Sequence, residues 1–398
     1  MRLNLTRLIC VCFFGLVAVF AIASCTFAQS NSRGAIVQMD RGALNNHFKA
    51  MGHRKGAGIS KGKTNKEEDE GHFGSLVHFS SSFTVGGVTF PFTMIGHPPK
   101  SGRKTEVRSV VVPLRFHFVG FGPNGDVNVD FDPTPAVNNI LASPIYQDAS
   151  FANGIGQFNE MEQRATFFNK MDPQRKWSVK FAPPRLMHAV DILVTPQTVG
   201  AFGLVQVGPN AFFGDALFDF VDAELRTIIQ VSGIEPDEVP VFITDGVTNE
   251  ALGFHNAITV TDDDGHERFQ AYIFTSWLDP ALVDPIVADI STINHETGEF
   301  FNDPFVNNVV PTWMYPPPGD PRTVCSGNNL LEVGDPEGNG PTFDDFPTVV
   351  VPLNGFPYHL QDLVLLPWFA DEVPSSAQNG WYDFPATTDI TVPAVYCK

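Results

Sequence analysis

Basic residues are scarce in this sequence. Its 398 residues include 25 Lys and Arg against 44 Asp and Glu, which gives a formal net charge of −19. Proteins that bind nucleic acid need a clustered basic surface to neutralise phosphates, so the composition argues against a nucleic-acid partner. An acidic chain fits solubility outside the cell, and its many carboxylates suit hard cations such as calcium.

Long apolar runs are also rare, and the one clear example lies at the N-terminus. Two Arg residues precede an apolar stretch from Leu8 to Ala23, and small residues follow as far as Ala28. This pattern predicts a secretory signal peptide over residues 1–28, so we expect the protein to be secreted. Cleavage after Ala28 is one interpretation, and a lipobox that leaves Cys25 lipidated is the other. No later stretch approaches the roughly 20 apolar residues that a membrane span needs.

Cysteine is used sparingly. Three of the five cysteines lie in or beside the predicted signal peptide, which leaves Cys325 and Cys397 in the mature chain. Two cysteines in an oxidising compartment predict one disulfide. The alternative is a pair of unbonded, buried thiols.

The rest of the composition is that of a globular protein with many turns, since it contains 36 Phe, 34 Gly and 32 Pro. Residues 29–73 offer little apolar surface to bury, so we predict a disordered linker or a propeptide there. Residues 74–205 are predicted to form a β-rich N-terminal region. Within it, residues 107–121 and 127–131 have the pattern of a hairpin, and residues 158–170 that of a helix.

Residues 206–398 are predicted to form a second domain. An amphipathic helix is expected over residues 212–231 and ends at Gly233. The strands expected after it cover residues 239–244, 255–260 and 269–277. A further helix is expected to start at Asp284 as N-cap and to stop before Pro304.

That last helix contains the sequence His295-Glu-Thr-Gly-Glu299, which matches the pattern His-Glu-x-x-Glu. Residues four apart on a helix share one face, and imidazole nitrogens and carboxylate oxygens are both normal zinc ligands. Glu296 has the position of the general base in the His-Glu-x-x-His helix of zinc peptidases, where it takes a proton from the attacking water. The alternative is an exposed helix that happens to carry a His and two acids.

The segment HETGE followed by NDP resembles zincin-type metallopeptidases, with Glu299 where most have a second His. The longer segments HETGEFFNDPFVNNVVPTW, LLEVGDP and YHLQDLVLLPWF resemble a group of uncharacterised secreted bacterial proteins related to the plant phosphate-induced, EXORDIUM-like cell-wall proteins. The resemblance is most specific from about Phe212 to the C-terminus. It implies an α+β fold in which a β-rich N-terminal portion precedes a zincin-like mixed sheet with an active-site helix. It also implies a metal site, without establishing an activity.

A zinc site needs a third protein ligand. The placement of Glu332 resembles that of the distant acidic ligand of glutamate-type zincins. Asp303 continues the face of His295 and Glu299 if the helix persists to Pro304, and otherwise belongs to a turn. We favour Glu332 narrowly. Asp335, in a Gly-rich segment, is a candidate for calcium.

Three further histidines lie in the predicted second domain. His359 lies in an apolar context and could stabilise a developing oxyanion, although a core His bonded to a backbone carbonyl is an equal reading. His255 and His266 fall in strands and a turn before the helix, and surface positions are expected for both.

These patterns favour a secreted zincin-like metalloprotein that acts as a zinc-dependent peptidase or related hydrolase on an extracellular peptide. The second hypothesis is a non-catalytic extracellular protein in which the metal is structural. The third is a carbohydrate-binding module that contacts a cell-wall polymer through exposed aromatic rings and holds no metal.

Overall fold

The computed structural model describes residues 34–51, 75–172, 176–261, 265–315, 324–325, 329–338 and 348–397. The predicted signal peptide (residues 1–28) and most of the predicted linker (residues 29–33 and 52–73) lie outside these ranges. Arg33–Lys398 forms one compact unit. None of the described helices has the length and apolar character needed to cross a membrane.

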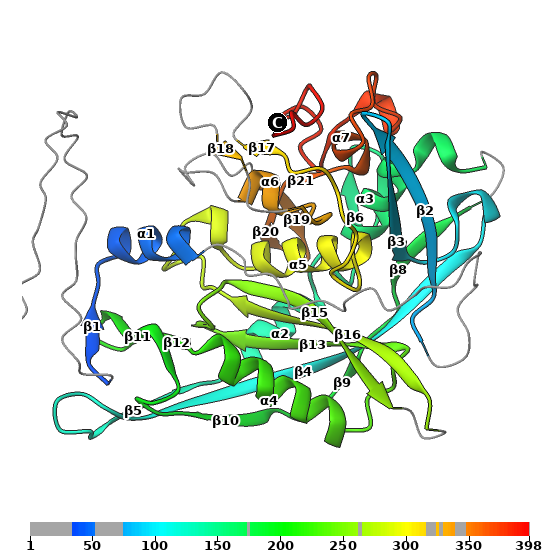
Figure 1. Ribbon diagram of the computed structural model, residues 1–398. Coiled ribbons are helices and arrows are strands. Elements are labelled where there is room, and N and C mark those ends of the chain that lie inside the picture. The colour runs from blue at the N-terminus through cyan, green and yellow to red at the C-terminus, as the bar shows by residue number, and fades with distance from the viewer. Residues whose placement is uncertain are drawn as a thin grey trace, which may run out of the picture. The chain divides into compact units, whose positions relative to one another are not determined.

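A sheet of eight strands built around one long strand, β4, organises this unit (Figure 1). The main order is β10-β4-β13-β16-β15, and three short strands also pair with β4. The strands are β4 (Lys104–Phe121), β5 (Val127–Phe131), β8 (Ser178–Phe181), β9 (Arg185–Leu186), β10 (Val190–Val194), β13 (Glu238–Asp245), β15 (Gly253–Thr261) and β16 (Glu267–Trp277). Strand β13 is parallel to both β4 and β16, whereas β15 at the edge is antiparallel to β16.

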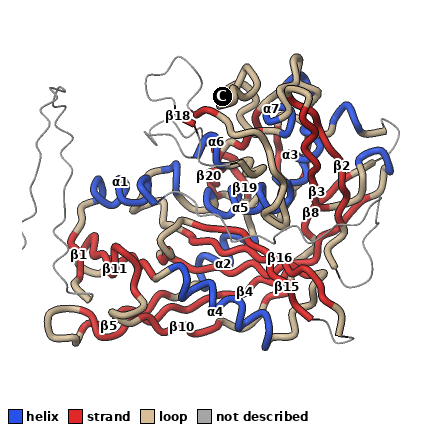
Figure 2. Tube along the Cα trace, in the orientation of Figure 1, coloured by secondary structure: helices blue, strands red, loops and turns tan. Residues whose placement is uncertain are grey.

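Helices cover both faces of this sheet, which explains why β4 and β13 are apolar on both faces. Alternate residues of β4 join different cores: Val111 packs in the core that contains α5 (Ser291–Asn302), and Val112 in the core that contains α4 (Phe218–Val231). Figure 2 shows the strands of the sheet between these two helices. Because β4 comes from the predicted N-terminal region and β13 from the predicted second domain, the predicted boundary at residue 205 does not separate two units.

A smaller sheet of four strands includes β1, the first strand of the described chain. Its order is β1-β11-β12-β14, from β1 (Ile36–Gln38), β11 (Val199–Gly208), β12 (Ala211–Ala216) and β14 (Val247–Thr248). Helix α1 (Arg41–Met51) follows β1 and buries Leu44 and Phe48. The prediction of disorder is therefore wrong for residues 34–51, because a few apolar side chains in a polar segment suffice to anchor it to a surface that the rest of the chain supplies.

The helix predicted over residues 212–231 begins later than expected, at Phe218, because β12 takes the residues before it. The motif helix also starts late. Asp284 and Pro285 introduce a single 3-10 turn, Pro285–Val287, and α5 starts at Ser291. It ends before Pro304, as predicted, since proline cannot continue a helix.

Smaller elements lie on the α5 side of the sheet. Two hairpins are formed by β2 (His78–Val85) with β3 (Val88–Ile95), and by β19 (Thr348–Leu353) with β20 (Phe356–Gln361). The remaining elements are α2 (Thr134–Leu141), β6 (Ala149–Phe151), β7 (Gly154–Gly156), α3 (Phe158–Thr166), β17 (Met314–Tyr315), β18 (Val324–Cys325), α6 (Asp335–Gly338), β21 (Leu363–Val364), α7 (Leu366–Phe369) and β22 (Asp383–Phe384). The structure thus confirms a mixed fold of helices and sheets.

Candidate metal centre

Helix α5 is buried along its whole length, so its polar side chains have almost no contact with solvent. His295, Glu296 and Glu299 are 0%, 1% and 4% exposed. The alternative of an exposed helix that happens to carry a His and two acids therefore does not hold. Buried ionisable groups need a partner, so their surroundings decide what they can do.

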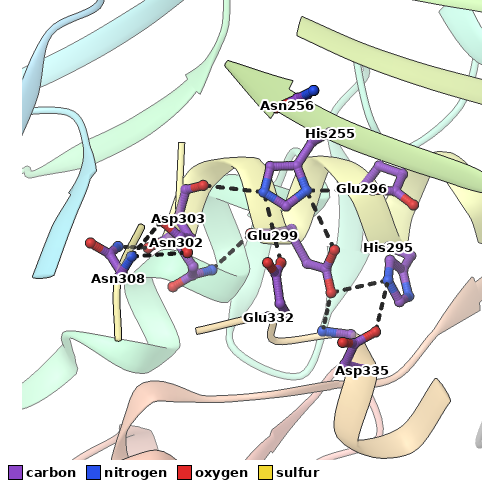
Figure 3. Close-up of polar contacts among 12 residues, drawn as sticks. His255, Asn256, His295, Glu296, Glu299, Asn302, Asp303, Asn308, Glu332 and Asp335 are labelled. Atoms are coloured by element: carbon purple, nitrogen blue, oxygen red, sulfur yellow. Dashed lines mark hydrogen bonds and ion pairs between the residues drawn. The ribbon is translucent and has the colours of Figure 1, made fainter. Parts of the chain in front are cut away.

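His295 and Glu299 face each other one turn apart, with 3.0 Å between Nε2 of His295 and Oε1 of Glu299 (Figure 3). The other ring nitrogen, Nδ1, lies 2.9 Å from the side-chain oxygen of Gln361, whose amide nitrogen donates to the Gly334 carbonyl. Because that oxygen can only accept, Nδ1 carries a proton, and Nε2 is directed at the carboxylate. Such an outer partner that orients the ring is typical of a metal-binding histidine.

His255 joins this cluster from the edge strand β15. Its Nδ1 lies 3.5 Å from Oε2 of Glu296 and 3.5 Å from Oε2 of Glu299. Its Nε2 donates to the backbone carbonyl of Asp303 at 3.1 Å. The expected surface position is wrong, because the side chain is 2% exposed. The apolar neighbours in Gly253-Phe254-His255-Asn256-Ala257 were the available signal that this strand is buried.

Glu332 completes the group from the segment before α6. Its Oε2 lies 3.7 Å from Nε2 of His255, and the side chain is 2% exposed. Neither carboxylate oxygen has a hydrogen-bond partner. A buried carboxylate without a donor is costly unless a proton or a cation neutralises it. Burial, reinforced by the charge of Glu299, raises the pKa of Glu332 well above its ordinary value.

The other ionisable groups respond to the same close packing. Burial alone would lower the pKa of His295, but the carboxylates around it, Glu299 first, raise that pKa to about 9. Burial would likewise lower the pKa of His255, which Glu332, Glu296 and Glu299 instead raise well above its ordinary value. Burial favours neutral Glu299, yet the two histidines hold its pKa well below its ordinary value. The cluster therefore attracts positive charge strongly.

Two overlapping groups of side chains could hold a metal ion. One is His255, Glu299 and Glu332, and the other is His295, Glu296 and Glu299, with the ligand atoms of each group within 4.8 Å of one another. In tetrahedral zinc sites ligand atoms lie about 3.4 Å apart, given metal–ligand bonds of about 2 Å. The separations of 3.0 and 3.5 Å around Glu299 are close to that value. The sequence predicted that His295, Glu299 and Glu332 bind one metal ion together. In the structure Glu299 belongs to both groups, whereas His295 and Glu332 belong to different ones.

Asp303 and His359, both predicted site residues, form hydrogen bonds with residues outside the cluster. The Asp303 carboxylate accepts the backbone N–H groups of Asn307 and Asn308, as its alternative role in a turn requires. The His359 ring lies 2.5 Å from the carboxylate of Asp289 through Nδ1. Among the described residues, neither belongs to a group of potential metal ligands.

Asp335, the calcium candidate, lies beside the cluster at the start of α6. Its Oδ1 is 3.9 Å from Nε2 of His295. The preceding residue must be glycine, because a Cβ atom on Gly334 would lie 2.4 Å from Nδ1 of His295. This segment therefore packs directly against the imidazole.

Cys325 and Cys397 lie at disulfide distance, with 5.8 Å between their Cα atoms. The backbone nitrogen of Cys397 also donates to the carbonyl of Thr312, and β17 pairs with β18. The C-terminus is thus tied to the chain that follows α5.

Comparison of this chain with protein-family models, with curated proteins and with solved structures finds no match.

Proposed function

We propose that this chain is a secreted, zincin-like metalloprotein in which a zinc ion serves as a structural clamp. The ion would be held by His255, His295, Glu299 and Glu332, and would join α5, the edge strand β15 and the segment before α6. The observation that carries the proposal is the carboxylate of Glu332, which is buried without any hydrogen-bond donor.

The donor set favours zinc over calcium. Calcium takes oxygen ligands only, whereas the cluster presents two imidazoles whose protons on Nδ1 of His295 and Nε2 of His255 are directed at acceptors outside it. The remaining nitrogen of each ring is directed at Glu299, the arrangement that a shared cation would satisfy.

The burial of the ligands favours a clamp over a catalyst. Structural zinc sites are closed by four protein ligands, and catalytic sites keep a position open to solvent. All four proposed ligands are at most 4% exposed. The carbohydrate-binding alternative has less support, because Trp313, Trp368 and Tyr382 are also buried.

A zinc-dependent hydrolase is the second candidate, and one observation favours it. The antiparallel edge strand β15 borders α5, and its residues 258–261 are partly or fully exposed, so an extended peptide could add to that part of the sheet edge. Zinc would supply Lewis-acid polarisation of a carbonyl. Glu296, packed against Gly253 of that strand, would accept the proton of the attacking water.

Metal analysis of the purified protein tests the proposal. We expect about one zinc ion per chain, lost in His295→Ala and retained in Glu296→Gln and in the surface control His188→Ala. Chelation should lower the melting temperature of the wild type, because a ligand that binds only the folded state stabilises it. A wild type that contains no metal at neutral pH would overturn the site.

Hydrolysis of casein or a peptide library then separates the two candidates. The clamp predicts no activity from the zinc-loaded wild type. Activity that disappears in Glu296→Gln, while the zinc content stays the same, would instead establish the hydrolase.

A further inference from the structure

A cavity lies apart from the metal centre, beside the β2–β3 hairpin. Its volume is about 760 Å³, within the range of small-molecule sites. The polar part of its lining comes from two lysines, two histidines and three consecutive serines: Lys100, Lys170, His78, His97 and Ser80–Ser82. None of the described residues that line it is acidic, in a chain with 44 Asp and Glu.

Two further cavities have a different chemistry. One combines Lys180 with Glu106 and Asp148, and the other is lined by several aspartates and no basic residue among those described. The cavity beside β2 therefore carries more positive charge than either of these two cavities.

The backbone around this cavity is held in place before any ligand binds. The carbonyl of His97 accepts a hydrogen bond of 2.7 Å from the indole N–H of Trp177, and the His97 nitrogen donates to Thr105. Gly96, at φ +102°, donates to Val77, and a Cβ atom there would lie 2.4 Å from Val179. A preformed site loses less conformational entropy on binding.

The side chains suit an anion that also carries hydroxyl groups. Lys170 places its ammonium 5.7 Å from the ring centre of Phe167, which restricts the side chain beside the cavity. The ring of His78 is oriented by its Nδ1–H bond of 2.8 Å to the Leu76 carbonyl. Ammonium groups pair with phosphate or carboxylate, while the serine hydroxyls both donate and accept.

We propose that this cavity binds an acidic monosaccharide, that is, a sugar bearing a phosphate or a carboxylate. The two lysines would neutralise the acid group. Side chains alternate along β2, so Ser81 lies on the opposite face from Ser80 and Ser82, and the sugar hydroxyls would be met by the serine hydroxyls of one face together with backbone groups of the strand. The proposal does not depend on the metal centre, since none of the residues it uses belongs to that cluster.

Isothermal titration calorimetry with four probes tests this proposal: glucose 6-phosphate, glucuronate, glucose and inorganic phosphate. We expect at least one acidic sugar to bind the wild type more tightly than glucose or phosphate alone. The variant Lys100→Gln/Lys170→Gln should lower that affinity by about ten-fold or more, because the charge-assisted hydrogen bonds of both ammonium groups are lost. Lys180→Gln, in a different cavity, is the matched control and should bind as the wild type does.

The two acidic sugars distinguish a phosphate-bearing ligand from a carboxylate-bearing one. Failure of both to bind would overturn the proposal, and so would phosphate binding as tightly as the sugars. Binding that survives the double substitution would also overturn it. Thermal unfolding of each variant checks that the fold is kept, as expected for Lys100, which is exposed, and Lys170, which is half-buried.

Discussion

His255 and Glu299 face each other across 3.5 Å although one lies on a sheet edge and the other on a helix. Glu299 also contacts His295 through its other carboxylate oxygen. One carboxylate thus lies between two buried imidazoles, and this relationship links the edge of the central sheet to the helix that carries the sequence motif.

Substitution of His255 by Ala should remove the proposed zinc ion as completely as substitution of His295. The reason is that a zinc site loses most of its affinity with one of its nitrogen ligands. Zinc content of the purified variants measures this effect, with His188→Ala as the control. Full zinc occupancy in His255→Ala would show that β15 contributes no ligand.

Gly334→Ala should weaken binding of the proposed zinc ion, although Gly334 is not itself one of the proposed ligands. The new Cβ would lie 2.4 Å from Nδ1 and 2.8 Å from Cγ of His295, so the ring must move and its bond to Gln361 must break. Loss of an outer partner typically costs about 10- to 100-fold in metal affinity, which competition with a chelator can measure. Gly208→Ala, where a Cβ would meet its nearest neighbour at 3.6 Å, is the control and should bind normally. Equal affinities in the two variants would contradict the packing described.

Glu162→Gln should stabilise the protein at alkaline pH and leave it nearly unchanged at acid pH. Burial raises the pKa of Glu162 from 4.5 to about 7, despite hydrogen bonds from Gln163, Thr166 and Asn302. Below pH 4.5 the carboxyl is protonated in both the folded and the unfolded state, so it costs nothing. Between pH 4.5 and 7 the unfolded state ionises first, and the free energy of unfolding falls by roughly 3 kcal/mol.

Urea unfolding of wild type and Glu162→Gln at pH 4.5 and pH 8 measures this difference. The gain in the variant should appear only at the higher pH. A constant difference between the two proteins at both pH values would show that Glu162 keeps its ordinary pKa in the folded state.

Phe48→Ala should destabilise the whole fold by about 3 kcal/mol, as large-to-small core substitutions do. Phe48 is 1% exposed and packs edge-to-face on Phe213, with 5.2 Å between ring centres. Denaturant unfolding gives the free energy, and Phe168→Ala is the control because Phe168 is 45% exposed. An effect no larger than that of the control would restore the prediction that this segment is not part of the folded unit.

Much of the secondary structure follows from local pattern. Strands β13, β15 and β16 and the end of α5 at Asn302 match the predicted positions, because apolar periodicity and Pro304 act over a few residues. The predicted starts of α4 and α5 were wrong, because these positions depend on more than the local pattern of residues. Strand β12 also pairs with the distant strand β14, and the N–H of Asp284, which precedes the 3-10 turn, donates to the side chain of Asn45.

The sequence by itself determined that His295, Glu296 and Glu299 share a buried helix, since a four-residue spacing and apolar neighbours dictate that much. Only the tertiary structure decided what surrounds them. His255 is brought to Glu299 by the antiparallel pairing of β15 with β16, and Glu332 by the return of the chain after α5. The proposed ligand set comes from separate elements, so it depends on sheet pairing and packing, which no local pattern of residues encodes.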